Sequence, residues 1–91
     1  MRNYEIITIF QDGQDIQASK KSFQEILERN GAKITSDEDW GVRKLPHSLK
    51  RQLSGFYYYC KCQLNPEKMK DVNHDMLISQ DILHHMVTVL N

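Results

Sequence analysis

Runs of β-branched and aromatic residues at the two ends of the chain predict strands over 4–10 and 82–90. Between residues 15 and 30 the apolar positions Ile16, Phe23, Ile26 and Leu27 recur near a helical period, and Gly31 can supply the left-handed residue that ends a helix. This segment is therefore predicted to be an amphipathic helix.

The second half of the chain repeats this pattern. Asn65-Pro66 is a helix-start signal, an N-cap followed by proline at the first helical position. Met69, Val72 and Met76 then follow at spacings of three and four, which predicts a helix that packs this stripe on a sheet.

Two further strands are predicted between the helices, over 32–45 and 55–64. The first is expected to be bulged at Trp40-Gly41 and to end at Pro46, which cannot donate to a sheet ladder, and 46–54 is expected to be a loop. Alternation in the second places one set of side chains in the core and another on an open sheet face. The core set is Phe56, Tyr58, Cys60, Cys62 and Leu64; the open set is Tyr57, Tyr59, Lys61 and Gln63.

The element order β-α-β-β-α-β predicts one α+β domain over 1–91 with a ferredoxin-like fold, a four-stranded antiparallel sheet with both helices on one face. RNA-recognition domains use such an open face, but the same architecture also hosts enzymes, metal carriers and regulatory domains. The fold alone therefore does not decide the function.

Composition is that of a folded globular protein, with 40% hydrophobic and 26% charged residues. No apolar run approaches the roughly 18 residues of a membrane span, and the start lacks the features of a signal peptide, so a cytoplasmic protein without membrane contact is expected. Cys60 and Cys62 lie two apart on one strand face, which predicts reduced, buried thiols.

Charge is balanced overall, 12 Lys and Arg against 12 Asp and Glu, but it is unevenly distributed. Between Gly41 and Tyr59 the chain has four cations and no acid, and three acids come directly before: Arg43, Lys44, Lys50 and Arg51, after Asp37, Glu38 and Asp39. The cations could bind phosphates or form a solvated edge that prevents aggregation. Tyr57 and Tyr59 could stack on bases, cover a protein partner or pack across strands.

Catalytic and metal sites are not predicted. His84 and His85 are adjacent on a strand and face opposite ways, so with His74 at most two of the three imidazoles converge. No motif activates Ser48 or Ser54, and the glycines are isolated. The residues therefore favour neither a metal centre nor nucleophilic catalysis.

Five short motifs, in this order and spacing, make the whole chain similar to bacterial small-subunit ribosomal protein six. They are Met1-Arg2-x-Tyr4-Glu5, Asn30-Gly31-Ala32, Trp40-Gly41-x-Arg43-Lys44-Leu45, Gly55-Phe56-Tyr57, and Asp81-Ile82-Leu83 with Met86-Val87. The resemblance implies a protein of the cytoplasmic small ribosomal subunit that has no enzymatic activity, no cofactor and no small-molecule substrate. It further implies binding to the central domain of small-subunit ribosomal RNA as a heterodimer with the basic ribosomal protein eighteen.

Site residues follow from the same resemblance. Arg2 and Tyr4 would lie near the RNA, the hairpin cations would contact phosphates or the partner, and Trp40 and Leu45 would pack or contact the partner. The full predicted set is Arg2, Tyr4, Trp40, Arg43, Lys44, Leu45, His47, Lys50 and Arg51. Departures from the family are Pro46-His47, where alanine and tyrosine are common, and His84, where arginine is common. The alternatives are a homodimeric small monooxygenase and a ligand-binding regulatory domain of the same fold.

Overall fold

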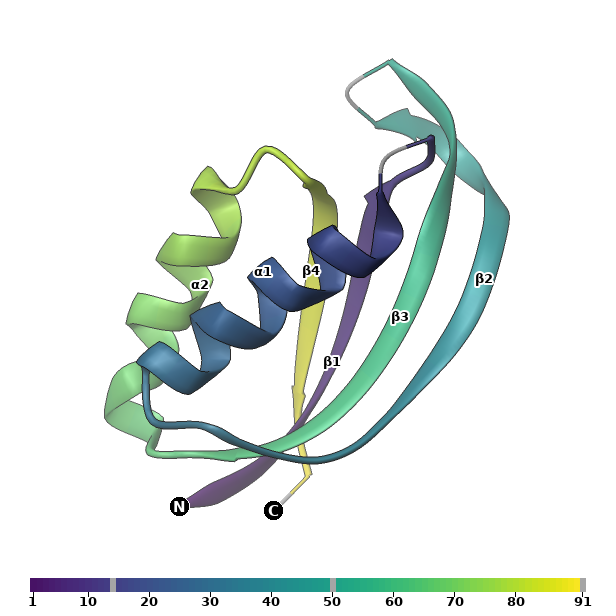
Figure 1. Ribbon diagram of the computed structural model, residues 1–91. Coiled ribbons are helices and arrows are strands. Elements are labelled where there is room, and N and C mark those ends of the chain that lie inside the picture. The colour runs from purple at the N-terminus through teal and green to yellow at the C-terminus, as the bar shows by residue number, and fades with distance from the viewer. Residues whose placement is uncertain (14, 50, 91) are drawn as a thin grey trace.

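A computed structural model describes residues 1–13, 15–49 and 51–90 of the chain. Its elements are β1 (Arg2–Gln11), α1 (Ile16–Arg29), β2 (Lys33–Leu49), β3 (Gln52–Leu64), a 3-10 turn (Pro66–Lys68), α2 (Met69–Ile78) and β4 (Ile82–Val89). The strands pair antiparallel in the order β2-β3-β1-β4, and both helices cover one face of the sheet (Figure 1). The predicted ferredoxin-like fold is confirmed.

Side-chain caps lie at both predicted helix starts, although Asn65 caps the 3-10 turn that leads into α2 and not α2 itself. The Asp15 carboxylate accepts a hydrogen bond from the Ala18 N–H at 3.3 Å, and the Asn65 side chain accepts one from the Glu67 N–H at 3.0 Å. At the other end of α1, Gly31 has a φ of 81°, the left-handed conformation that a helix exit requires. Local chemistry thus sets the helix boundaries.

The core lies between the sheet and the helices. Alternate residues of β1 and β3 point into it, and the rings of Phe10, Phe23 and Tyr58 meet there with centroids 5.5–6.2 Å apart. The predicted faces of β3 are confirmed, with Phe56 half-buried and packed against the core. Cys60 and Cys62 are buried free thiols, as predicted. The hydrogen bond to Cys62 and burial raise the pKa of the Cys60 thiol, so it stays protonated.

The prediction that Pro46 ends the second strand is wrong. β2 continues through Pro46 and His47 to Leu49, so much of the predicted loop 46–54 belongs to a long hairpin. Because β2 is an edge strand that pairs only with β3, a proline there can lack its N–H at small cost, and the register shifts between Lys44 and Leu49. The hairpin projects beyond the rest of the sheet, at the end away from both chain termini (Figure 1).

Candidate nucleic-acid interface

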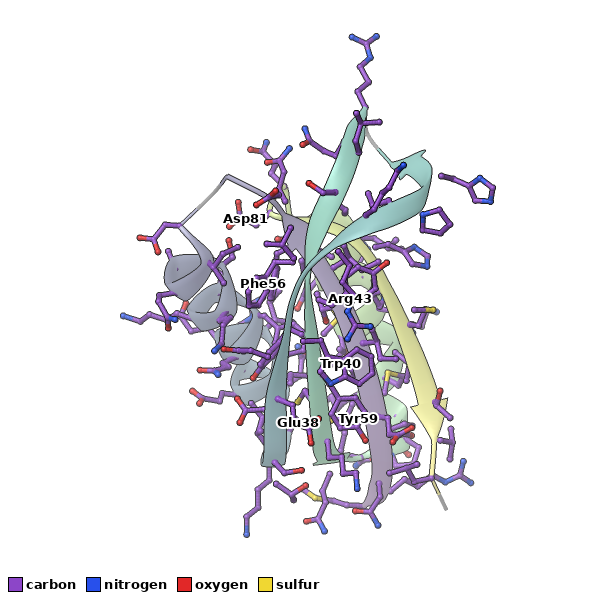
Figure 2. The ribbon with its side chains drawn as sticks, turned by 90° about the vertical axis from the view of Figure 1, so that its right-hand side faces the viewer. Glu38, Trp40, Arg43, Phe56, Tyr59 and Asp81 are labelled. Carbon is purple, nitrogen blue, oxygen red and sulfur yellow. The ribbon has the colours of Figure 1, made fainter. Side chains whose placement is uncertain are left out.

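A column of stacked side chains covers part of the sheet face that lies away from the helices. The rings of Trp40 on β2 and Tyr59 on β3 lie nearly parallel, with centroids 5.3 Å apart and planes 9° apart (Figure 2). The Trp40 indole Nε1–H donates to Glu38 at 3.1 Å, and the Tyr59 hydroxyl donates to the carboxylate of Glu5. That hydrogen bond raises the pKa of Tyr59 to about 12, so the phenol remains a donor at neutral pH.

Arg43 lies on the same face. Its guanidinium carbon is 5.3 Å from the centroid of the Trp40 ring and 5.6 Å from that of Tyr57, within the range of cation–π attraction (Figure 2). The side chain is nevertheless exposed. The rings therefore hold a cation at the surface in a restricted position.

Tyr57 packs within a second, smaller apolar cluster on this face. It contacts Ile9, Leu45 and Leu83, which are 4%, 5% and 7% exposed. The sequence left base stacking, contact with a protein partner and cross-strand packing open for Tyr57 and Tyr59. Both rings contact neighbouring strands, which favours packing.

The described hairpin cations are exposed. Arg43 pairs with Gly55 and Lys44 with Ser54, so these neighbouring side chains point to opposite faces of the hairpin. Arg51 has a φ of 64° and sits in the turn, where a left-handed residue joins the two strands. His47 is exposed on the same hairpin, while Lys50 lies outside the described residues.

Two predicted site residues lie elsewhere. Arg2 is exposed and pairs with Leu64, at the opposite end of the sheet from the hairpin turn. Tyr4 is only 3% exposed and belongs to the main core, so the expectation that its side chain lies at an RNA surface is corrected. The structure therefore brings Trp40, Arg43 and Leu45 together and leaves Arg2 and Tyr4 apart from them.

An apolar hollow of about 250 Å³ opens beside the basic hairpin. Its lining comes from β1, β2, β3 and β4: Ile9, Leu45, Pro46, His47, Tyr57, His84 and Met86. The positions that depart from the family pattern, Pro46-His47 and His84, thus meet at one hollow. Sequence reasoning missed Ile9 and Met86, although strand alternation alone would have placed them on this face.

Neither a metal centre nor a membrane helix is found among the described residues. Across 1–13, 15–49 and 51–90 no three His, Cys, Asp or Glu side chains are placed to hold an ion. His85 contacts Asn73 on the helix side at 3.1 Å, whereas His84 lines the hollow on the other face. In the same ranges no helix is long and apolar enough to cross a membrane.

Comparisons with known proteins give matches that span nearly the whole chain. The family model described as Ribosomal protein S6 matches residues 3–88. Proteins named small ribosomal subunit protein bS6 from two strains of Leptospira biflexa serovar Patoc are each 30% identical over 91 residues, covering 100% of this chain and 99% of theirs. The crystal structure of 30S ribosomal protein S6 from Thermotoga maritima shares the fold, with a TM-score of 0.85 at 17% identity over 97% of this chain and 86% of that one. The family match and these relatives show that the chain belongs to the ribosomal protein S6 family.

Proposed function

We propose that this protein binds the central domain of small-subunit ribosomal RNA together with ribosomal protein eighteen. Membership of the S6 family makes it a structural protein of the bacterial small ribosomal subunit, in the cytoplasm. To this family role the proposal adds the contact with the RNA central domain and the protein partner. The family assignment also favours this function over a monooxygenase or a ligand-binding regulatory domain.

The observation that carries the proposal is a projecting hairpin whose described cations are exposed and unpaired. In the described part of the hairpin, Arg43, Lys44 and Arg51 form no ion pair. The acids that precede them are engaged elsewhere. Asp39 pairs with Lys20 at 2.9 Å, Asp37 accepts from the Tyr58 hydroxyl at 2.6 Å, and Glu38 accepts from Trp40. The cations are therefore available for phosphate oxygens.

We infer that recognition of RNA uses the backbone rather than base stacking. Base stacking requires open ring faces. Trp40 and Tyr59 each cover one face of the other ring, and Arg43 lies over the ring of Trp40. Arg43, held over two rings, presents a planar set of donors of the kind that matches phosphate oxygens.

The partner is proposed to use the apolar hollow beside the hairpin. A hollow of about 250 Å³ has room for an apolar side chain, and buried Leu45 and half-buried Tyr57 supply apolar walls. A basic partner would add the positive charge that this neutral chain lacks.

The test is a charge-matched pair of double variants. Arg43→Ala with Arg51→Ala removes two hairpin cations, and Lys21→Ala with Lys70→Ala removes two exposed cations from the helices. The hairpin variant should bind the RNA fragment more weakly and with a salt slope shallower by about 1.5. Both pairs should fold normally, since an exposed charge changes the free energy of unfolding by no more than about 0.5 kcal/mol.

Gel-shift titration with the partner present would measure these affinities. The hairpin assignment would be contradicted if the hairpin variant bound RNA as the wild type does. It would also be contradicted if the helix variant lost as much affinity as the hairpin variant.

A further inference from the structure

The edge strand β4 lacks the usual protection against pairing with another chain. It forms one border of the sheet, and from Ile82 to Leu90 the sequence has no Lys, Arg, Asp, Glu or Pro. Edge strands are normally protected by charges, proline or a covering segment. The opposite edge, β2, has both charges and Pro46. In Figure 2 no further element lies beyond β4.

The pairing of β4 with β1 determines which backbone N–H and C=O groups of β4 point outward, away from the sheet. The Leu90 N–H donates to the Asn3 carbonyl at 2.8 Å, and in an antiparallel pair such bonds recur at every second residue. His85, Val87 and Val89 are the intervening residues. Their N–H and C=O groups consequently point away from β1, toward the position of a next strand.

Apolar side chains flank this edge on both faces of the sheet. On the open face Met86 is 44% exposed. On the helix face the contact between Asn73 and His85 places that side of α2 next to β4, and Leu77, one turn later, is 72% exposed. Leu77 also lines a hollow of about 160 Å³ formed between α2 and the start of β4.

We propose that β4 pairs antiparallel with β4 of a second copy of this chain, so that the two sheets become continuous. In a two-fold arrangement each strand meets its own sequence, and a charged residue would face a like charge near the axis. β4 has no Lys, Arg, Asp or Glu, so this repulsion between like charges does not arise. The pairing satisfies the outer backbone groups and buries Leu77 of both copies. It uses the edge opposite the hairpin strand and does not depend on the proposed RNA binding.

Sedimentation velocity over micromolar to millimolar concentrations tests the proposal in the absence of RNA. The 10.7 kDa chain should shift from monomer to dimer. Leu77→Lys should weaken the dimer about a hundredfold, roughly tenfold for each of the two buried copies of Leu77, because every dimer carries the substitution twice. Leu53→Lys is the matched control, since Leu53 is 74% exposed but lies on the β2–β3 hairpin.

Amide hydrogen exchange then locates the interface. On dimerisation the N–H groups of His85, Val87 and Val89 should exchange more slowly, and amides of the outer edge of β2 should not change. A chain that stays monomeric at millimolar concentration overturns the proposal. So does a dimer that Leu53→Lys disrupts as strongly as Leu77→Lys, or one without added protection on β4.

Discussion

At Gly55, β3 passes so close to β1 that a side chain would not fit. A Cβ atom there would lie 2.5 Å from Ile9 Cγ2 and 3.2 Å from the Phe10 carbonyl oxygen. Gly55→Ala should therefore lower the free energy of unfolding by about 1–3 kcal/mol, the usual cost of overpacking. Urea denaturation measures this. Leu53→Ala, at an exposed position of the same strand, is the control and should be near neutral. Equal stability of the two variants would contradict the close approach.

His85 should make stability depend on pH. Burial, and secondarily the charge of nearby His84, lower the pKa of His85 in the folded protein. Below the ordinary value of about 6.5 the unfolded chain then binds the proton more readily, so the free energy of unfolding falls as the pH falls through this window. At pH values above this window His85 is neutral in both the folded and the unfolded state and does not lower the free energy of unfolding.

Glutamine at the two histidine positions separates this effect from other titrations. His85→Gln should flatten the decline in thermal stability between pH 7 and pH 5. His84→Gln should retain most of it, because burial of His85 is the larger cause. An unchanged decline in His85→Gln would mean that other groups are responsible.

Residue-level prediction from sequence succeeded where the pattern was local. The alternation of β3 assigned Tyr58, Cys60 and Tyr59 to the correct faces. Tyr4 was assigned from the family motif alone, although it alternates with Ile6, Thr8 and Phe10, all of which are buried. The same alternation rule would have placed it in the core.

The β2–β3 hairpin depends on a few apolar contacts at the element scale. Leu45 is 5% exposed and packs with Ile9, Leu83 and Tyr57, which connects the hairpin to the sheet. Leu45→Ala should cost about 2 kcal/mol or more. It should also increase amide exchange in the hairpin before the rest of the sheet. Val42→Ala, at a position of β2 that is 56% exposed, should do neither. A neutral Leu45→Ala would show that the cluster does not hold the hairpin.

Element boundaries could be predicted only as far as they are local. Gly31 at the exit of α1 and Asn65 before the turn that leads into α2 act through their own chemistry, and both were predicted. Asp15 was predicted only as the approximate start of α1, and its role as the cap was not. The passage of β2 through Pro46 could not be predicted, because a proline is tolerated only once the strand is known to be at an edge. The stack of Trp40 on Tyr59 depends on the register across the shift between Asp39 and Gly41, which pairing with β3 sets.

Although the whole molecule has no net charge, the acids and the cations of the hairpin region lie in different surroundings. The acids near the base of the hairpin are paired with Lys20, Tyr58 and Trp40, and the cations beyond them stand exposed on the projection. The chain termini lie at the other end of the sheet (Figure 1). A protein with no net charge can thus present a local group of exposed, unpaired cations on its projecting hairpin.

The most direct test of this account is the affinity of the wild-type chain for a fragment of the ribosomal RNA central domain, measured across a salt series with and without ribosomal protein eighteen. We expect tighter binding with the partner, and affinity that falls with salt with a slope of roughly −0.7 to −0.9 per phosphate neutralised. Absence of binding by the folded chain with its partner present, or binding that salt does not weaken, would contradict the account.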